Sequence, residues 1–543
     1  MKNKVIIAMV GFGNIGSYFY KTLLKNKKLI ALKTGKIPII KYISAKNLKK
    51  NRKTKIPKSK WVKNSLSLVY LKDVDIIIEL IGGSEGMAKK LVFSALKNKK
   101  HVITANKSLI AKYGDELSKI AEKNKVNLEY EASVAGGVPI IRSIKQGLIA
   151  NKISKIYGIL NGTTNFILST MEKSGKPFND VLSKAKKLGF AESNPVSDLN
   201  GNDAADKIKI LSSLAFNKKI SNEKILVEGI QNINLVDIIH AKSLGYKIKL
   251  LGISEIRKNK LVQRVHPCLV VKNSYIGNID GVLNAIIVDG FPVGRSILQG
   301  EGAGPGPTTS AIISDLCSIL RENINYPFGV SSLLRKRIQN FDISNHICSS
   351  YLRIEVKDIP GVLSSITKNF AKNHISIKNL IQLPDKKNKK ADIIIITHEN
   401  LEKDETILKL NSCKYYLSKE VTSLINLKFS PKLVFRIDRS IDEISNIEKL
   451  LRKEKVLSSE QNCSRFGVDM FLSLARERVY SPRRVQSHGW LRGLTSARPC
   501  WRLNSSWGRS INPRSRSRGL MLLTLGGLTS RNTPAYSGVL LLK

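Results

Sequence analysis

Short, unbroken apolar runs alternate with helical patterns along the first part of the chain. Such alternation is typical of βαβ units, in which helices join parallel strands, and it predicts a doubly wound parallel sheet. Because the runs are strand-length rather than membrane-length, we expect no transmembrane helix. The predicted strands are Val5–Val10, Ile37–Ile43, Asp75–Leu80 and Lys100–Thr104, and the predicted helices lie near Tyr18–Leu24, Ala88–Leu96 and Gly114–Asn124.

The pattern changes twice further along the chain. Runs at Gln263–Val271 and Ala285–Val288 predict strands of a second domain of α+β type. A glycine-rich loop, 300–309, then precedes an apolar helix predicted at Ser310–Leu320, with a threonine expected to cap the helix start. Such a loop can return to the first domain through its backbone amides, although a plain interdomain turn remains an alternative.

A third pattern begins near Ser350 and predicts strand, helix, strand, strand. Its strands are expected at Tyr351–Val356, Ile375–Leu380 and Asp392–Thr397, with a turn into the helix at Asp358–Leu363. The order and the D-x-P-G turn resemble the ACT domain, a ferredoxin-like amino-acid sensor.

A glycine-rich turn ends the first predicted strand. Three glycines follow the G-x-G-x-x-G spacing between a strand and a helix, the context that a dinucleotide-binding turn requires. The first glycine permits the tight turn, the second lets the backbone approach a pyrophosphate, and the third lets helix and strand pack closely. Another glycine, Gly82, follows the third predicted strand and is a further expected cofactor contact. The expected cofactor contacts in the turn are Gly11, Phe12, Gly13, Asn14, Ile15 and Gly16.

The end of the second predicted strand bears on the choice of nicotinamide cofactor. An acidic residue there accepts a hydrogen bond from the ribose of NAD, whereas a cation favours the 2′-phosphate of NADP. The chain has no acid at 44–47 and offers Lys46. This favours NADP over NAD, although Lys46 could also be one more solvated lysine.

The formal net charge of +49 raises the question of nucleic-acid binding. The excess is mostly lysine scattered over almost every segment, without the interleaved aromatic residues that stack on bases. A general lysine bias explains it better, and we expect neither a nucleic-acid nor a membrane partner. The chain enters a strand almost at once, which leaves no room for a signal peptide and predicts a cytoplasmic protein. Six dispersed cysteines without a C-x-x-C pair indicate neither a zinc site nor a disulfide framework.

The segment after Asn200-Gly201 carries an acid and a base at helical spacing. Asp203 and Lys207 stand four residues apart, so a helix would place them on one face. An adjacent carboxylate and ammonium suit a substrate that bears both charges, or a lysine that transfers a proton. On spacing alone, an ordinary surface ion pair is the simpler interpretation.

Taken together and in order, several motifs over residues 4–325 resemble homoserine dehydrogenase. This family interconverts L-homoserine and L-aspartate 4-semialdehyde with a nicotinamide cofactor, on the route to threonine, methionine and isoleucine. Lys46-Asn47 stands where many relatives show Arg-Asp, and Asp206 stands where histidine is common. The motifs are GFGNIG, ELIGG, HVITANK, EASVAGGVPII, GILNGTTNFIL, LGFAE, DLNGNDAADK, VHP and GEGAGPGPT.

The resemblance implies roles for five residues. Lys207 is expected to move the proton at the substrate oxygen, and Lys107 to lie close to both substrate and cofactor. Asp203 is expected to orient the reacting oxygen or a water, Glu192 to hold the substrate amino group, and Asp198 to lie nearby.

The resemblance also implies a cation loop, subunit contacts and a domain plan. Backbone carbonyls of the loop containing Glu131, Val134, Gly136 and Val138 would hold a monovalent cation, with sodium expected, although the segment could simply be a glycine-rich crossing between domains. Gly302 would contact the cofactor, and a homodimer or homotetramer is expected. The expected domains are an NADP-binding Rossmann domain at 1–132 joined by 302–325, a catalytic and dimerisation domain at 133–301, and an ACT domain at 350–428.

The ACT resemblance implies feedback control by an amino acid, with threonine the expected effector and Gly361 near it. A structural dimerisation domain that binds nothing is the alternative. A second alternative for the whole chain, an oxidoreductase acting on another β-semialdehyde, would need a nucleophilic cysteine in the catalytic domain. Cys268, the only cysteine there, has no activating motif around it.

Composition breaks after an extension of uncertain character at 429–462. The tail at 463–543 is rich in arginine, holds three of the four tryptophans, and shows no persistent helical or strand period. An arginine-rich nucleic-acid arm is one interpretation. A foreign or out-of-frame extension, expected to be disordered, fits the abrupt change better.

Overall fold

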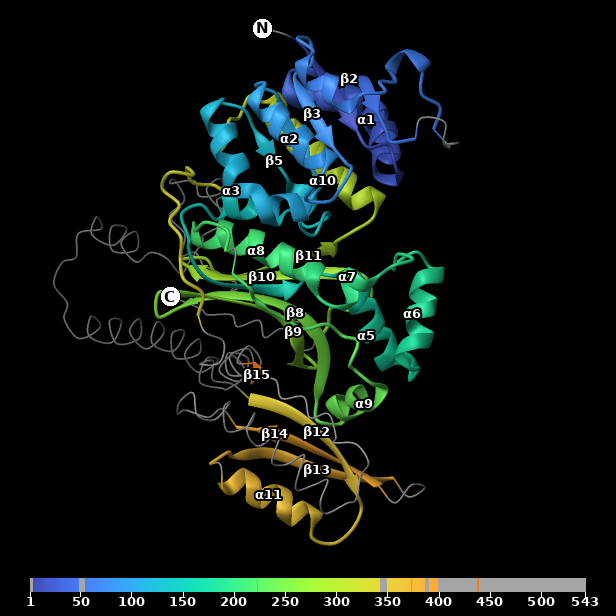
Figure 1. Ribbon diagram of the computed structural model, residues 1–543, viewed down its shortest axis with the longest axis vertical. Helices are drawn as coiled ribbons and strands as arrows, with labels where there is room; N and C mark the ends of the chain where they lie inside the picture. Colours follow the sequence, from blue (N-terminus) through green and yellow to red (C-terminus); the bar gives the residue numbers. More distant parts are fainter. Residues whose placement is uncertain are drawn as a thin grey trace, which may run out of the picture. The chain divides into compact units, whose positions relative to one another are not determined.

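The computed structural model describes residues 3–47, 54–221, 223–341, 349–372, 374–385 and 390–398, together with the short strand 437–438 (Figure 1). All of these lie in one compact unit, Met1–Val456. The predicted tail at 463–543 and almost all of the extension at 429–462 lie outside the described residues. Within these ranges, no helix combines the length and apolarity needed to cross a membrane.

The first domain is built on a parallel sheet, as the strand pattern predicts. Its strands are β1 (Lys4–Val10), β2 (Ile37–Ser44), β3 (Ile76–Glu79), β4 (His101–Thr104) and β5 (Leu128–Glu129). They follow the order β2-β1-β3-β4-β5, with every neighbouring pair parallel. The order reverses between β1 and β3, and ligands of such sheets bind at the carboxyl ends of the strands at this point. The doubly wound sheet is therefore confirmed.

Helices cover this sheet, and one of them comes from much later in the chain. Two short 3-10 helices, η1 (Lys58–Lys60) and η2 (Ser65–Tyr70), lie between β2 and β3. The longer helices are α1 (Asn14–Thr34), α2 (Met87–Lys97), α3 (Lys107–Lys123) and α10 (Pro305–Leu320). Helix α10 packs against α1, so the chain returns to its first domain after completing the second (Figure 1).

Two of these helices begin earlier than their apolar patterns indicate. Helix α3 begins at Lys107 rather than near Gly114, because the side chain of Asn106 accepts a hydrogen bond from Leu109 N and caps it. Helix α10 begins at Pro305 rather than Ser310, since proline is tolerated in a first turn. The predicted threonine cap was wrong, because Gly304 occupies that position without a side-chain bond.

A short crossing leads into the second domain, which is a mixed sheet covered by helices. The crossing contains η3 (Glu131–Ser133), α4 (Ile140–Arg142) and the π-turn η4 (Ser143–Gly147). The strands are β6 (Lys152–Ile159), β7 (Leu226–Val227), β8 (Tyr246–Arg257), β9 (Lys260–Val271), β10 (Leu283–Phe291) and β11 (Gly294–Glu301), in the order β11-β10-β6-β8-β9-β7. The helices are α5 (Gly162–Ser174), α6 (Phe178–Lys187), α7 (Val196–Leu199), α8 (Asn202–Phe216) and α9 (Leu235–Ser243). Helix α8 packs across β6, β8 and β9 and also against α3 of the first domain.

A buried arginine beyond α10 ties the two domains together. Arg335 donates hydrogen bonds to Asp115 on α3 and to Ser213 on α8, and its guanidinium lies 4.0 Å from the centre of the Phe328 ring. An arginine with no exposed side-chain surface is costly to bury unless it is paired in this way. It therefore holds α3 and α8 in a fixed relation.

The third domain has the predicted strand-helix-strand-strand order. It consists of β12 (Ser349–Lys357), α11 (Val362–Lys372), β13 (Ile377–Asp385), β14 (Lys390–Thr397) and the short β15 (Ile437–Asp438). The sheet is antiparallel with the order β13-β14-β12-β15. The apolar face of α11, with Ile366 and Phe370, packs on this sheet.

Candidate active site

One carboxylate lies between two ammonium groups where α3 meets α8. Asp203 Oδ2 is 2.8 Å from Lys207 Nζ, and Asp203 Oδ1 is 3.0 Å from Lys107 Nζ. Asp203 is 5% exposed and Lys207 is 8% exposed. The helical spacing of Asp203 and Lys207 is confirmed, but the pair is buried, so the ordinary surface pair is the wrong interpretation. The resemblance implied a role for each residue, and the structure brings all three together.

The Lys207 ammonium is held by two acceptors. Besides Asp203, it donates to the Leu160 carbonyl at 2.7 Å, just after β6 ends. An ammonium has three N–H bonds, so one remains for a further acceptor. Lys107 is more open, with 38% of its side chain exposed. The two lysines can therefore present hydrogen-bond donors to the same small molecule.

Asn161 bridges the acidic groups of the site, and sequence analysis did not single it out. Its Nδ2 donates to Asp198 Oδ1 and to Asp203 Oδ2, each at 2.9 Å. Its Oδ1 accepts from Thr164 N at 2.8 Å and so caps α5. An asparagine directly before an apolar helical run is an N-cap signal, which could have marked the position. The amide thus joins the start of α5 to both carboxylates.

Charge in the site is distributed unequally. Burial would raise the pKa of Asp203, but the charges of Lys207 and Lys107 outweigh it and hold that pKa well below its usual range. Burial and the charge of Asp203 raise the pKa of Asp198. Burial alone would lower the pKa of Lys107, yet the carboxylates of Asp203 and Asp198 raise it overall. Asp203 is therefore ionised, and Lys107 is kept as a cation.

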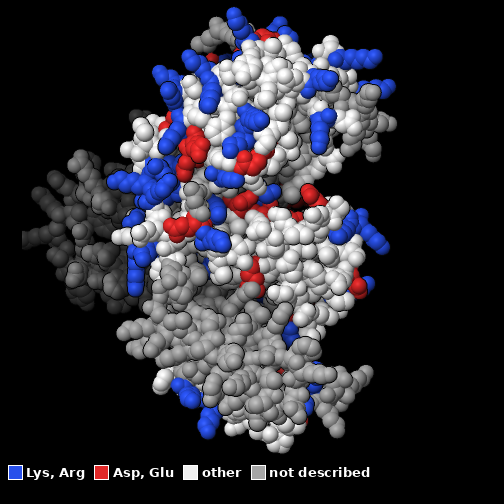
Figure 2. All heavy atoms as spheres, in the orientation of Figure 1, with Lys and Arg blue, Asp and Glu red and all other residues white. Residues whose placement is uncertain are grey.

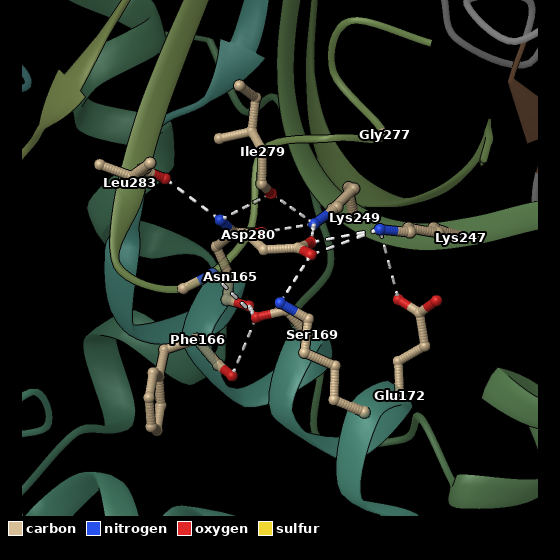
Figure 3. Close-up of polar contacts among 12 residues, drawn as sticks. Asn165, Phe166, Ser169, Glu172, Lys247, Lys249, Gly277, Ile279, Asp280 and Leu283 are labelled. Carbon is tan, nitrogen blue, oxygen red and sulfur yellow. Dashed lines mark hydrogen bonds and ion pairs between the residues drawn. The ribbon is translucent and has the colours of Figure 1, made fainter. Parts of the chain in front are cut away.

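A buried polar cluster anchors the first turn of α5 (Figure 3). Lys249 on β8 donates to the Asn165 side chain and to Asp280 Oδ1, each at 3.0 Å. The Asn165 amide donates in turn to the carbonyl of Ile279 at 3.1 Å. Since Asn165 lies about one helical turn after Asn161, the cluster fixes the helix end that carries Asn161.

The glycine-rich turn after β1 has the shape that a dinucleotide requires. A Cβ atom added to Gly11 would lie only 2.4 Å from the Leu80 carbonyl oxygen, and one added to Gly16 would lie 2.4 Å from the Gly11 carbonyl oxygen. Both contacts are too short, so only glycine fits at these positions. Gly13 has no neighbour within 4 Å of such a side chain, so its backbone is open to a ligand. It lies directly before α1, whose first amide groups favour a phosphate.

The other predicted cofactor contacts lie at different places around the turn. Phe12 is buried edge-on against Trp61, while Asn14 and Ile15 form the first turn of α1. Gly82 follows β3 with a φ of 85°. The more distant candidates are Lys46, which is exposed just after β2, and Gly302, whose carbonyl accepts from Gly136 N at 2.9 Å.

Glu192, a predicted substrate contact, does not contact the other predicted site residues in the structure. It is exposed on the loop between α6 and α7. Among the described residues, no hydrogen bond or ion pair joins it to Asp198, Asp203 or either lysine. Its role stays a prediction.

The predicted cation loop surrounds a buried carboxyl group. The Glu131 carboxylate accepts from Ile141 N and Arg142 N at 2.9 and 2.8 Å. Burial, only partly opposed by these hydrogen bonds, raises its pKa to about 7. Asp315 on α10 accepts from Glu131 N, and its pKa is also raised by burial. The crossing between the domains therefore contains a buried carboxyl group that we expect to titrate near neutral pH.

We expect this buried carboxyl group to make stability fall as pH rises. Glu131 binds a proton more tightly in the folded chain, with a pKa of about 7 against 4.5, so the folded state holds more protons between these values. The free energy of unfolding should then decrease across this window, by at most about 1.4 kcal/mol per pH unit from this one group. Urea unfolding at several pH values measures the slope.

Glu131→Gln should flatten that slope even though it lowers stability at every pH. The matched control is Glu116→Gln, because Glu116 is exposed on α3. Parallel slopes for wild type and Glu131→Gln would contradict the assignment.

On the one face that Figure 2 shows, the basic side chains of the described residues are not gathered into one stripe. On the face shown in Figure 2, lysine and arginine are scattered over the described surface, and acidic atoms gather around an indentation. This scatter agrees with a general lysine bias.

Comparisons with known proteins find similarity over most of this chain. The model of the homoserine dehydrogenase NAD binding domain matches residues 11–131, that of homoserine dehydrogenase matches 139–317, and that of the ACT domain matches 350–408. A homoserine dehydrogenase of Neisseria gonorrhoeae is 40% identical over 405 residues, which cover 74% of this chain and 93% of that protein. One from Bacillus subtilis is 37% identical over 419 residues, covering 77% and 96%.

A solved structure has a similar fold. The crystal structure of a homoserine dehydrogenase from Thiobacillus denitrificans has a TM-score of 0.70 and 34% identity, and the match covers 80% of this chain and 98% of that one. The sequence identity to these relatives, the nearly full coverage of their length and the shared fold lead to one conclusion. The chain belongs to the homoserine dehydrogenase family.

Proposed function

We propose that the chain catalyses the NADP-linked, reversible interconversion of L-homoserine and L-aspartate 4-semialdehyde in threonine, methionine and isoleucine biosynthesis. The observation that carries this proposal is the buried Asp203 carboxylate between Lys107 and Lys207. Two ammonium groups beside an aldehyde oxygen stabilise the negative charge that develops when a hydride reaches its carbon. The nicotinamide supplies or accepts that hydride when it is bound.

Lys207 is the group that we assign to proton transfer at the substrate oxygen. During reduction its ammonium gives a proton to the developing alkoxide, and during oxidation the neutral amine takes the hydroxyl proton. Asp203 and the Leu160 carbonyl hold the nitrogen in place, so its remaining N–H is the one directed to substrate. Lys107, kept charged by Asp203, polarises the same oxygen.

The acidic residues suit the amino group of the substrate. Asp198 lies on α7, and the Asn161 amide donates hydrogen bonds to both Asp198 and Asp203. Glu192 lies on the loop that precedes α7. We assign the substrate ammonium to Glu192 with Asp198 nearby. Movement of the loop toward Asp198 on binding would bring Glu192 to the substrate.

The cofactor preference is assigned to Lys46. It is exposed just beyond the carboxyl end of β2, where the ribose of a dinucleotide lies in such sheets. Lys46→Glu should lower the ratio of kcat/KM for NADPH to that for NADH by about tenfold or more, because a carboxylate repels the 2′-phosphate and accepts from a 2′-hydroxyl. Initial rates with each cofactor measure the ratio.

A matched control for this change is Lys72→Glu, since Lys72 is exposed on the loop before β3, at the amino ends of the strands, whereas Lys46 follows the carboxyl end of β2. It should leave the ratio unaltered. An unchanged ratio in Lys46→Glu would return Lys46 to the class of ordinary solvated lysines.

A monovalent cation, with sodium expected, would be held by carbonyl oxygens of the 131–138 loop. Carbonyl oxygens suit a hard cation. The carbonyls of Glu131 and Val138 already accept hydrogen bonds from Val134 N and Ile140 N, so each would have to bind the ion through its second lone pair. The site therefore fits a weakly held ion that supports the loop.

Feedback regulation is assigned to the third domain. It has the ACT fold, and Gly361, at a φ of 92°, forms the turn into α11 where an amino acid such as threonine would bind. Control of turnover requires two states of the enzyme that bind the effector unequally. We expect the active species to be a homodimer or homotetramer.

The function is tested by following NADPH oxidation with L-aspartate 4-semialdehyde. Turnover should require the charged groups of the substrate, so butyraldehyde, which lacks both the amino and the carboxylate group, should react far more slowly. Oxidation of L-homoserine with NADP should give the reverse reaction. Folded protein that turns over neither substrate would refute the proposal.

A further inference from the structure

Glu79, the last residue of β3, is a fully buried carboxyl group for which the reaction has no direct use. It is 0% exposed, and no lysine or arginine in the described part of the chain forms an ion pair with it. Burying a carboxylate without a cation is unfavourable unless hydrogen bonds replace its water. Its three hydrogen-bond donors therefore indicate what the residue does.

The first arm of the Glu79 network reaches the loop that follows β3. Glu79 Oε1 accepts from Ile81 N at 2.6 Å and from Gly82 N at 3.0 Å. This loop begins beside the glycine-rich turn, because a side chain at Gly11 would meet the Leu80 carbonyl at 2.4 Å. One carboxylate oxygen thus holds the backbone at Gly82, a predicted cofactor contact.

The second arm runs from Glu79 to the start of α3. Glu79 Oε2 accepts from the Thr104 hydroxyl at 2.6 Å, and Thr104 Oγ1 accepts from Asn106 N at 3.0 Å. Asn106 caps α3 through Leu109 N at 3.1 Å. The Asn106 amide also donates to the Gly83 carbonyl at 2.7 Å, which joins the second arm to the first.

These hydrogen bonds lead to Lys107, a residue of the candidate active site. Lys107 directly follows Asn106 and is the first residue of α3, so the cap fixes where its side chain begins. Its ammonium then reaches Asp203 Oδ1 at 3.0 Å. We propose that Glu79 is a positioning residue, which sets the loop at 81–83 for the cofactor and, through Thr104 and Asn106, the start of the helix that carries Lys107. This inference rests on the proposed function.

The two arms give separable expectations. Glu79→Gln weakens both, because its amide has a single acceptor oxygen, which cannot serve the loop amides and the Thr104 hydroxyl at once, and any hydrogen bond that it keeps has lost the negative charge of the acceptor. We expect the dissociation constant of NADPH to rise and kcat to fall, each by at least about tenfold, the factor for one lost hydrogen bond to a charged group. Thr104→Val removes only the second arm, so kcat should fall to a similar extent while NADPH binding changes by less than about threefold.

Two controls separate positioning from general stability. Asp75 directly precedes the same strand at its other end and accepts from Ile6 N at 2.7 Å, so Asp75→Asn also neutralises a carboxylate that binds a backbone amide. It should lower the melting temperature without altering NADPH affinity or kcat by more than about twofold. Thr104→Ser keeps the hydroxyl and should retain most of the wild-type kcat.

The experiment measures NADPH affinity by fluorescence titration and turnover with L-aspartate 4-semialdehyde, using the full chain. Wild type that binds no NADPH or shows no turnover would refute the proposed function itself. If wild type is active, unchanged affinity and kcat in folded Glu79→Gln would overturn the positioning role, as would equal kinetic losses in Asp75→Asn. If Glu79→Gln does not fold, the comparison of Thr104→Val with Thr104→Ser decides, and equal kcat in these two would overturn it.

Discussion

Replacing Lys207 by alanine is expected to lower kcat for L-aspartate 4-semialdehyde reduction by about 10³-fold, within the range that general acid–base groups contribute. The ammonium is fixed by Asp203 and the Leu160 carbonyl, so no neighbouring group can take its place without moving. The KM for NADPH should change little, because the glycine-rich turn lies on another domain. Steady-state rates measured while both substrates are varied give kcat and the KM for NADPH separately.

Lys209→Ala is the matched control for Lys207→Ala. Lys209 lies on the same helix, is half-buried, and makes no described contact with the site. Its removal should leave kcat within about twofold of wild type, as for surface changes away from special features. If folded Lys207→Ala retained more than a tenth of the wild-type kcat, proton transfer would have to be reassigned, with Lys107 the next candidate.

Replacing Asp203 by asparagine is expected to lower kcat/KM by about 10²- to 10³-fold, as found when one preorganised electrostatic group is removed. The variant leaves the buried Lys207 ammonium and the half-buried Lys107 ammonium near each other without their shared carboxylate. It should also change the pH dependence. Because Asp203 raises the pKa of Lys107 and burial lowers it, loss of Asp203 must move that pKa downward.

Lys107 in Asp203→Asn would therefore lose its proton at lower pH than in wild type. If charged Lys107 polarises the carbonyl, the alkaline limb of the kcat profile for reduction moves to lower pH. A profile measured in both proteins tests this. A fall in kcat without movement of the alkaline limb would indicate that Asp203 acts only by holding Lys207. Asp206→Asn serves as a milder comparison, since Asp206 accepts from Ser108 rather than from a lysine.

Local pattern was enough to predict the main elements of the fold. The strand at Val5–Val10 and the turn after it form a complete unit within a few neighbouring residues, so spacing alone identified them. The strand-helix-strand-strand order after Ser350 was predicted for the same reason. The start of α3 was missed because its cap, Asn106, lies before the apolar period begins.

The site itself could be predicted only in part. The four-residue spacing of Asp203 and Lys207 is a helical property and placed both on one helical face, but only the resemblance to homoserine dehydrogenase marked them as site residues. Asn161 and Glu79 were not singled out, because their functions depend on partners brought close by the fold. Asn161 meets Asp203 across 42 positions of sequence, and Glu79 meets Thr104 across 25.

For this protein, the sequence by itself determined the periodicities, the glycine-rich turn and the type of residue at each reacting position. These depend on interactions between neighbours in the chain, which a period or a short motif expresses directly. Tertiary structure alone decided that Lys107 and Lys207 share one carboxylate, that Asp203 and Lys207 are buried, and that Asn161 and Glu79 meet their distant hydrogen-bond partners. Burial and charge are properties of surroundings assembled from distant segments, and they distinguish this site from an ordinary pair of ions on the surface.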